Sequence, residues 1–151
     1  MKKILLLSFL LCTALMVQAQ TDSLNIRSVF NQMPDSLMPY LTKNNRLDMM
    51  DFMDAKMKAA VDNTLGGESR MIFLSDDSLC VVLSDALTIE LKLQKENAET
   101  VIVMKKTYET TKRQKEILIG RYSSSWRLIS DFVVESSLLK RDDEVFSKPH
   151  F

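Results

Sequence analysis

Residues 79–93 read Leu-Cys-Val-Val-Leu-Ser-Asp-Ala-Leu-Thr-Ile-Glu-Leu-Lys-Leu and contain two different strand patterns. In residues 87–93, leucine and isoleucine alternate with threonine, glutamate and lysine, which is typical of a strand with one face in water. Residues 79–83 carry no charged side chain on either face, and residues 101–104 are also apolar throughout. A strand that is apolar on both sides needs a cover on its second face, so the sequence predicts further structure packed on the sheet.

Similar β-prone runs extend from this stretch to both sides. They occupy residues 70–74, 79–83, 87–93, 100–108, 116–122 and 126–134. Short polar segments separate the runs, and this spacing predicts an antiparallel meander. Ser75-Asp76-Asp77-Ser78 is the clearest hairpin turn, because Asp and Ser side chains hydrogen-bond to the nearby backbone.

The chain before Gly66-Gly67 follows a helical period instead, and the glycine pair is interpreted as the break between helix and strand. Thr21-Asp22 is the predicted N-cap of a first short helix, and residues 35–41 form a helical or 3₁₀ turn. A second helix is predicted to start with Asn45 as its N-cap. Its apolar stripe consists of Leu47, Met50, Met53, Met57 and Val61.

These patterns predict an α+β domain in which N-terminal helices pack on a twisted antiparallel sheet of about five to six strands. The front is helical to about residue 65, and the back is strand-rich from about residue 68. A small β-sandwich or a partly closed barrel with a helical cover is the alternative.

The first residues are interpreted as a cleavable signal peptide. Lys2 and Lys3 precede a mostly apolar run over residues 4–17, and cleavage is predicted after Ala19. The run is shorter than the roughly 20 residues that a membrane-spanning helix needs. Leu11 before Cys12 argues against a lipoprotein, since lipidation requires a small residue there. We therefore expect residues 20–151 to form a single globular domain that is periplasmic or secreted.

Signal cleavage changes the charge and the cysteine count. The chain has 20 Lys+Arg and 20 Asp+Glu residues, so loss of Lys2 and Lys3 leaves a net charge of about −2. A nucleic-acid partner is therefore disfavoured, because binding phosphates requires a basic excess. Cys12 is removed too, which leaves Cys80 without an internal disulfide partner.

The expected domain contains no recognisable catalytic, cofactor or metal site. His150 is the only histidine, and Cys80 lies in an apolar run that makes a thiol inert. Asp48, Asp51 and Asp54 share one side of a helix, but a helix spreads its side chains outward, so a solvated face is the preferred interpretation.

The sequence therefore favours a non-enzymatic exported envelope protein that acts as a binding module for another envelope protein or a polymer. The residues predicted for its interaction surface are Met49, Phe52, Tyr108, Tyr122 and Trp126. One alternative is a carboxylate-only hydrolase of an envelope or dietary polymer, with Glu90 and Glu116 as candidate acids. Another is an inhibitor of a partner enzyme that presents Tyr122, Trp126 and Phe132.

Two segments at the front, residues 31–41 and 44–52, resemble an uncharacterised family of secreted Bacteroidales proteins, the domain-of-unknown-function family 3256. Tyr108, Tyr122 and Trp126 lie where the rest of that resemblance is expected. The resemblance implies export to the periplasm or cell surface. It implies no site residues, because no activity is assigned to the family.

Overall fold

The structure is a computed structural model that describes residues 24–97, 99–109 and 115–135. Its strands form one seven-stranded sheet, in which each strand pairs antiparallel with the next along the chain. They are β1 (Ala60–Asp62), β2 (Glu68–Leu74), β3 (Ser78–Ser84), β4 (Leu87–Glu96), β5 (Glu99–Glu109), β6 (Lys115–Tyr122) and β7 (Leu128–Glu135). Within the described ranges, helices α2 (Ile26–Gln32) and α3 (Lys43–Asp54) precede the sheet. The α+β class and the antiparallel meander are thus confirmed.

The six predicted strand runs correspond to β2 to β7, and β1 is an additional strand. The predicted five to six strands do not include β1, because Val61 fits the apolar period of the second helix. Gly66, with φ +83°, accordingly lies in the turn between β1 and β2 and not at a helix-to-strand break. The described strands form neither a sandwich nor a closed barrel, since β1 and β7 are the two ends of one open sheet.

The predicted hairpin turn at Ser75-Asp76-Asp77-Ser78 is confirmed between β2 and β3. The Ser75 N–H donates to the Ser78 carbonyl at 2.8 Å. The hydroxyls of Ser75 and Ser78 both donate to Asp77 Oδ1, at 3.0 and 2.6 Å. These side chains thus stabilise the turn as their residue types predict.

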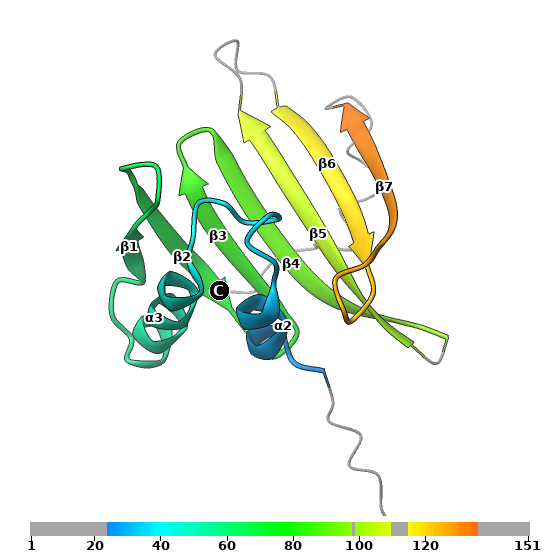
Figure 1. Ribbon diagram of the computed structural model, residues 1–151, viewed down its shortest axis with the longest axis horizontal. Coiled ribbons are helices and arrows are strands. Elements are labelled where there is room, and N and C mark those ends of the chain that lie inside the picture. The colour runs from blue at the N-terminus through cyan, green and yellow to red at the C-terminus, as the bar shows by residue number, and fades with distance from the viewer. Residues whose placement is uncertain (1–23, 98, 110–114, 136–151) are drawn as a thin grey trace, which may run out of the picture.

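Helices α2 and α3 lie on the same face of the sheet, in front of the half that contains β1 to β4 (Figure 1). We call this the helix face, and the opposite one the outer face. The helices and the sheet share the main hydrophobic core. Its fully buried members include Ile26, Phe30, Met38, Leu41, Met49, Val81, Leu83, Leu91 and Ile102.

Strand β3 shows how the apolar run of residues 79–83 is used. Leu79, Val81 and Leu83 are buried in the main core on the helix face, at 0–1% exposure. Cys80 and Val82 point to the outer face and are only half-buried. The helices are thus the cover that the sequence predicts on one face of β3, and the side chains on the other face remain half-buried.

Helix α3 is shorter and begins earlier than predicted. Its N-cap is Thr42, whose hydroxyl accepts from the Asn45 N–H at 3.1 Å, while Asn45 Oδ1 accepts from the Thr42 N–H. Asn45 therefore completes a capping box from inside the helix. The helix ends because Lys56 adopts the left-handed conformation, with φ 55°, and the Met57 N–H bonds back to the Phe52 carbonyl. This is a Schellman termination.

The buried side of α3 also differs from the predicted stripe. Leu47 and Met57 are 37% and 60% exposed, whereas Arg46 is only 1% exposed. Arg46 is buried because its guanidinium donates to the carbonyls of Met33 and Leu41 and to Asp35 Oδ1. These bonds tie the segment between α2 and α3 to the second helix. Helix α2 likewise has Asn25 as its N-cap, three residues beyond the predicted Thr21-Asp22.

Candidate functional site

The two edges of the sheet differ in length and in covering. Strand β1 has three residues and contacts α3. Strand β7 has eight residues and pairs with β6 on one side only, with no partner on its other side among the described strands. An unpaired strand edge presents backbone N–H and C=O groups in a regular row. The β7 edge is therefore the longer hydrogen-bonding surface that the described sheet leaves unused. Its regular part begins at Ser130, because the register of β6 and β7 shifts between the pairs Tyr122–Leu128 and Arg121–Ser130.

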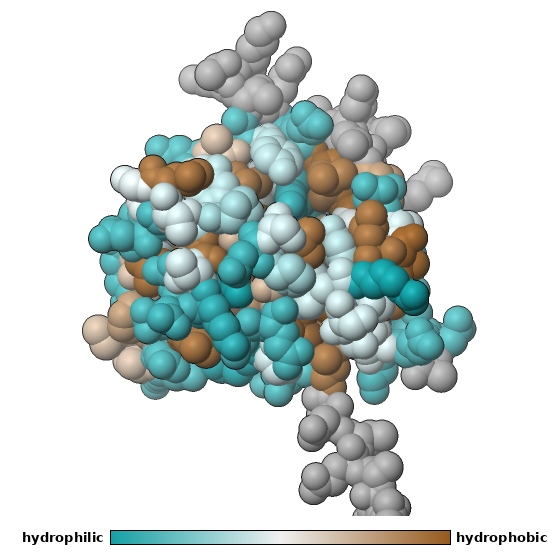
Figure 2. All heavy atoms as spheres, viewed as in Figure 1, coloured by the Kyte–Doolittle hydropathy of each residue, from teal (hydrophilic) through white to brown (hydrophobic). Residues whose placement is uncertain are grey.

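Strand β7 also carries exposed apolar side chains. Leu128, Ile129 and Phe132 are 50%, 53% and 43% exposed. The other large exposed apolar residues are spread over α3, β2 and the segments next to them. Figure 2 shows hydrophobic atoms at the margin of the molecule where β7 lies. An edge strand with this composition is typical of a site for association with another chain.

A second hydrophobic cluster leads to this edge on the outer face. It consists of Val101 and Val103 on β5 and of Ile117 and Ile119 on β6, all between 4% and 7% exposed. Ile119 is directly opposite Phe132 in the register of β6 and β7. The cluster therefore continues into an exposed aromatic ring at the edge.

The helix face of β7 carries an acidic side chain as well as an apolar one. Asp131 is exposed there directly opposite Gly120, and Leu128 is opposite Tyr122. A Cβ atom at Gly120 would lie 2.7 Å from the Tyr122 ring, so glycine gives the ring room to lie across β6. Asp131 forms no hydrogen bond or ion pair with any residue that the structure describes. Burial and, secondly, the negative charge of Asp131 raise the pKa of Tyr122.

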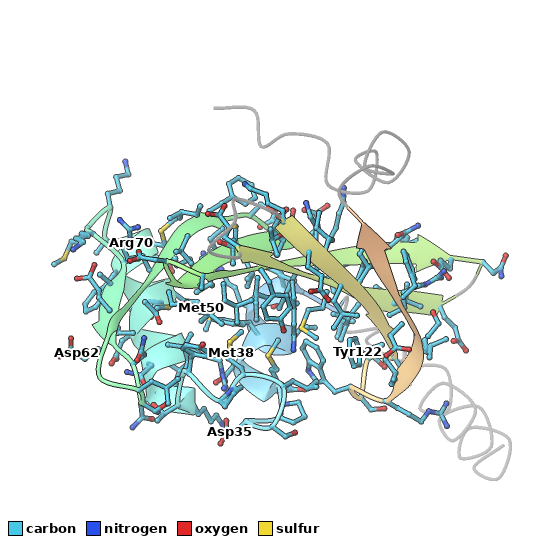
Figure 3. All side chains as sticks on the ribbon, turned by 90° about the horizontal axis from the view of Figure 1, so that it is seen from above. Asp35, Met38, Met50, Asp62, Arg70 and Tyr122 are labelled. Carbon is cyan, nitrogen blue, oxygen red and sulfur yellow. The ribbon has the colours of Figure 1, made fainter. Side chains whose placement is uncertain are left out.

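The connection from β6 to β7 is anchored to the first helix. The indole N–H of Trp126 donates to the Val29 carbonyl of α2 at 3.2 Å. The rings of Trp126 and Tyr122 lie 5.6 Å apart at 56°. In Figure 3, Tyr122 lies on the same side of the sheet as Met38 and Met50, with which it shares the main core. The start of β7 is therefore held by buried contacts.

A cleft of about 1320 Å³ adjoins the start of β7. It lies between the β6–β7 connection, the β4–β5 hairpin, the β2–β3 turn and the start of α2. Its lining includes Ser123, Ser124, Ser125, Arg127, Lys95, Glu99, Asp76 and Asp77. The pKa of Asp77 is lowered, chiefly by the hydrogen bond from Ser78, so this carboxylate stabilises the turn in its ionised form.

A family model described as protein of unknown function (DUF3256) matches residues 15–144. The chain belongs to this family. The resemblance in residues 31–52 is thereby confirmed. The fold is also similar to that of a domain of an uncharacterised protein from Porphyromonas gingivalis W83, with a TM-score of 0.56 and 17% identity.

That match covers 70% of this chain and 53% of the other, so the present chain spans about half of that structure. At this identity the likeness concerns the fold alone. No curated protein matches the chain. Neither the family nor the structural neighbour carries a described activity.

The residues predicted for an interaction surface do not lie together on one. Met49 is fully buried, and Tyr122 and Trp126 are 9% and 8% exposed, so all three belong to the main core. Phe52 is partly buried against that core, and Tyr108 is half-buried on β5. The three buried positions do not fit the sequence-based expectation of an exposed surface. Trp126 is buried where its indole N–H bonds to the Val29 carbonyl, Tyr122 packs beside it, and Met49 lies in the main core.

Of the three residues proposed for an inhibitory loop, only Phe132 is exposed. Leu128 and Ile129 were not recognised as site residues, although the sequence held a signal for them. The last strand of a meander is an edge strand, and residues 128–134 are too apolar for an edge that faces only water.

The candidate catalytic groups are separated. Glu90 lies on the outer face, with its carboxylate 3.1 Å from Lys105 Nζ, whereas Glu116 is opposite Tyr108 on the helix face. These two acids therefore do not converge. Burial and, to a smaller extent, Glu90 raise the pKa of the Cys80 thiol to about 12, so the thiol is protonated at neutral pH.

No group of three or more potential metal ligands occurs among residues 24–97, 99–109 and 115–135. Asp48 and Asp51 are exposed, and Asp54 pairs with Arg27 at 2.6 Å. Of the helices that the structure describes, none has the length and hydrophobicity needed to span a membrane.

Proposed function

We propose that this chain is an exported, non-enzymatic binding protein that takes up an extended segment of a partner protein as an additional strand beside β7. The observation that carries the proposal is a single one: an eight-residue edge strand has three exposed apolar side chains. Backbone hydrogen bonds supply affinity in this mode of recognition, and side chains supply specificity.

The chemistry of the edge favours a polypeptide partner over a sugar polymer. N–H and C=O groups that repeat at strand spacing are matched by another extended backbone. The apolar atoms of Leu128, Ile129 and Phe132 would lose contact with water when a strand is added. The leader interpreted from residues 1–19 would bring the chain to the cell envelope, where the partner is expected as well.

The anchored start of β7 also supports this function. Trp126 Nε1 is bonded to α2, and the Ser123 N–H donates to the Arg127 carbonyl at 2.9 Å just before β7 begins. A strand held in its bonding conformation loses little conformational entropy when a partner binds. The partner segment carries most of the ordering cost.

The test compares two substitutions of similarly exposed isoleucines. Ile129 and Ile72 are 53% and 51% exposed, on β7 and β2 respectively. The probe is a fluorescently labelled synthetic peptide of about twelve residues in which valine alternates with lysine. A second peptide has proline at one central position, which removes a backbone donor and disfavours strand pairing.

We expect fluorescence anisotropy to show binding of the alternating peptide to the natural chain, about tenfold weaker for Ile129→Lys and for the proline peptide. Ile72→Lys, which adds the same charge, should bind as the natural chain does. Hydrogen exchange of the β7 amides should slow when the peptide is bound. Absence of binding, equal binding of the proline peptide, or equal loss in both variants would overturn the proposal.

A further inference from the structure

Adjacent residues at the middle of β7 present different chemistry on the two faces of the sheet. Asp131 is opposite Gly120, and Phe132 is opposite Ile119. Successive side chains of a strand point to opposite faces, so the carboxylate and the ring lie on different sides of the edge. A strand added beside β7 would place one residue next to each of them.

On the outer face, Phe132 is the last of three side chains that lie side by side across β5, β6 and β7. Lys105 is opposite Ile119, and Ile119 is opposite Phe132. Ile119 is 7% exposed and Phe132 is 43% exposed, so apolar surface remains uncovered only at the outer end of this pair. A branched or aromatic side chain opposite Phe132 would cover it, as cross-strand apolar pairs do.

On the helix face, Asp131 has an exposed carboxylate and no ion pair among the residues described. Its neighbour toward the sheet is Gly120, which has no side chain to neutralise it. The position for a counter-charge is therefore on the other side of β7, where an added strand would lie. Oppositely charged residues directly across a pair of strands attract each other.

We infer that the partner segment carries two consecutive residues of defined chemistry: a branched or aromatic residue that faces Phe132, and a lysine or arginine that faces Asp131. This inference rests on the proposed addition of a strand at β7 and specifies the class of sequence that the edge selects. In an antiparallel addition the apolar residue comes first along the partner, and in a parallel addition the basic residue does.

The test reverses the charge at Asp131 in the chain and, separately, the charge of the residues in the peptide that would face Asp131. Three labelled peptides of about twelve residues are compared, in which valine alternates with lysine, valine with glutamate, or serine with lysine. The variants are Asp131→Lys, Phe132→Ala and, as a matched control, Asp62→Lys. Asp62 is an exposed acid on the other edge strand, β1, so its substitution changes the net charge by the same amount.

For the natural chain and for Asp62→Lys, we expect the valine–lysine peptide to bind about fivefold more tightly than the valine–glutamate peptide. Asp131→Lys should reverse this preference. The natural chain should also prefer valine–lysine over serine–lysine, and Phe132→Ala should remove that difference.

If Asp131→Lys keeps the preference for lysine, or if Asp62→Lys abolishes it, overall charge and not the pair decides binding, and the inference fails. If all three peptides bind the natural chain equally but remain sensitive to a central proline, strand addition stands and the inference fails. If no peptide binds, the proposed function itself fails.

Discussion

The half of the sheet around β1 to β4 and the half around β5 to β7 use similar apolar residues in opposite ways. In the first half, α2 and α3 cover the helix face, and Leu79, Val81 and Leu83 are buried. At the far edge of the second half, Leu128, Ile129 and Phe132 are about half exposed. The burial of a strand is thus decided by what packs against it and not by its own pattern.

Besides the pairing of β4 with β5 and the shared core, side chains from distant parts of the chain join the two halves. Trp126 precedes β7 and bonds to Val29 in α2, 97 residues away in the sequence. Tyr122 packs beside it in the main core. The covered half therefore contributes buried contacts that hold the start of β7 in place.

The largest expected difference in stability is between alanine variants of two phenylalanines. One lies in a helix that covers the first half of the sheet, and the other lies on β7 in the second half. Phe30 is fully buried in α2, and Phe132 is 43% exposed on β7. Phe30→Ala should lower the free energy of unfolding by about 3–5 kcal/mol, because it leaves a cavity in the core. Phe132→Ala should lower it by less than about 1 kcal/mol. Urea unfolding of both variants measures the contrast, and equal losses would show that β7 is part of the stabilising core.

A smaller difference in the free energy of unfolding is expected between methionine variants of two arginines in the helices. Arg46 is 1% exposed and donates to two backbone carbonyls, whereas Arg27 pairs with Asp54 at the surface. Arg46→Met should cost about 2–3 kcal/mol, because the Met33 and Leu41 carbonyls lose their buried donor. Arg27→Met should cost less than about 0.5 kcal/mol. Similar midpoints for the two variants in thermal unfolding would contradict this role of Arg46.

Much of the sheet was predictable because alternating apolar residues and turn-forming side chains depend only on neighbours in the sequence. The alternation in residues 87–93 and the Ser75-Asp76-Asp77-Ser78 turn each depend on neighbours in sequence, and both appear as predicted in β4 and the β2–β3 hairpin. Six strand runs were found in this way. The short strand β1 was missed because three residues carry too little pattern to outweigh the helical period before them.

The orientation of α3 was not predictable from its own residues. An arginine ordinarily marks a solvent-facing position, but Arg46 is buried because carbonyls from the preceding segment accept its hydrogen bonds. This turns Leu47 outward and Met49 inward. The same kind of distant contact buries Tyr122 and Trp126. The β7 edge, in contrast, could have been inferred from the position of the last strand in a meander.

A moderate loss of stability is expected when the hydrogen bond between Trp126 and the Val29 carbonyl is removed. Trp126→Phe keeps an aromatic ring but removes the donor to the Val29 carbonyl. The free energy of unfolding should fall by about 1–2 kcal/mol, since a buried acceptor is left without a partner. If the anchor positions the edge, hydrogen exchange should quicken at the start of β7 and remain unchanged in β2 and β3. Uniformly faster exchange would mean that Trp126 contributes only to overall stability.

The smallest effect on stability at neutral pH concerns Cys80, whose thiol tests how well the outer face of the covered half excludes water. Burial raises the pKa of its thiol from 9.0 to about 12, so at about pH 8 the folded chain contains roughly a thousandfold less thiolate than the unfolded chain. Alkylation by iodoacetamide should therefore be slow in the native chain and fast in denaturant. The stability from this protonated thiol is fully present below pH 9.0 and is lost as the pH rises toward about 12. Cys80→Ala should remove that part of the pH dependence, and rapid alkylation of the native chain would show that the outer face of β3 is as open to water as the β7 edge.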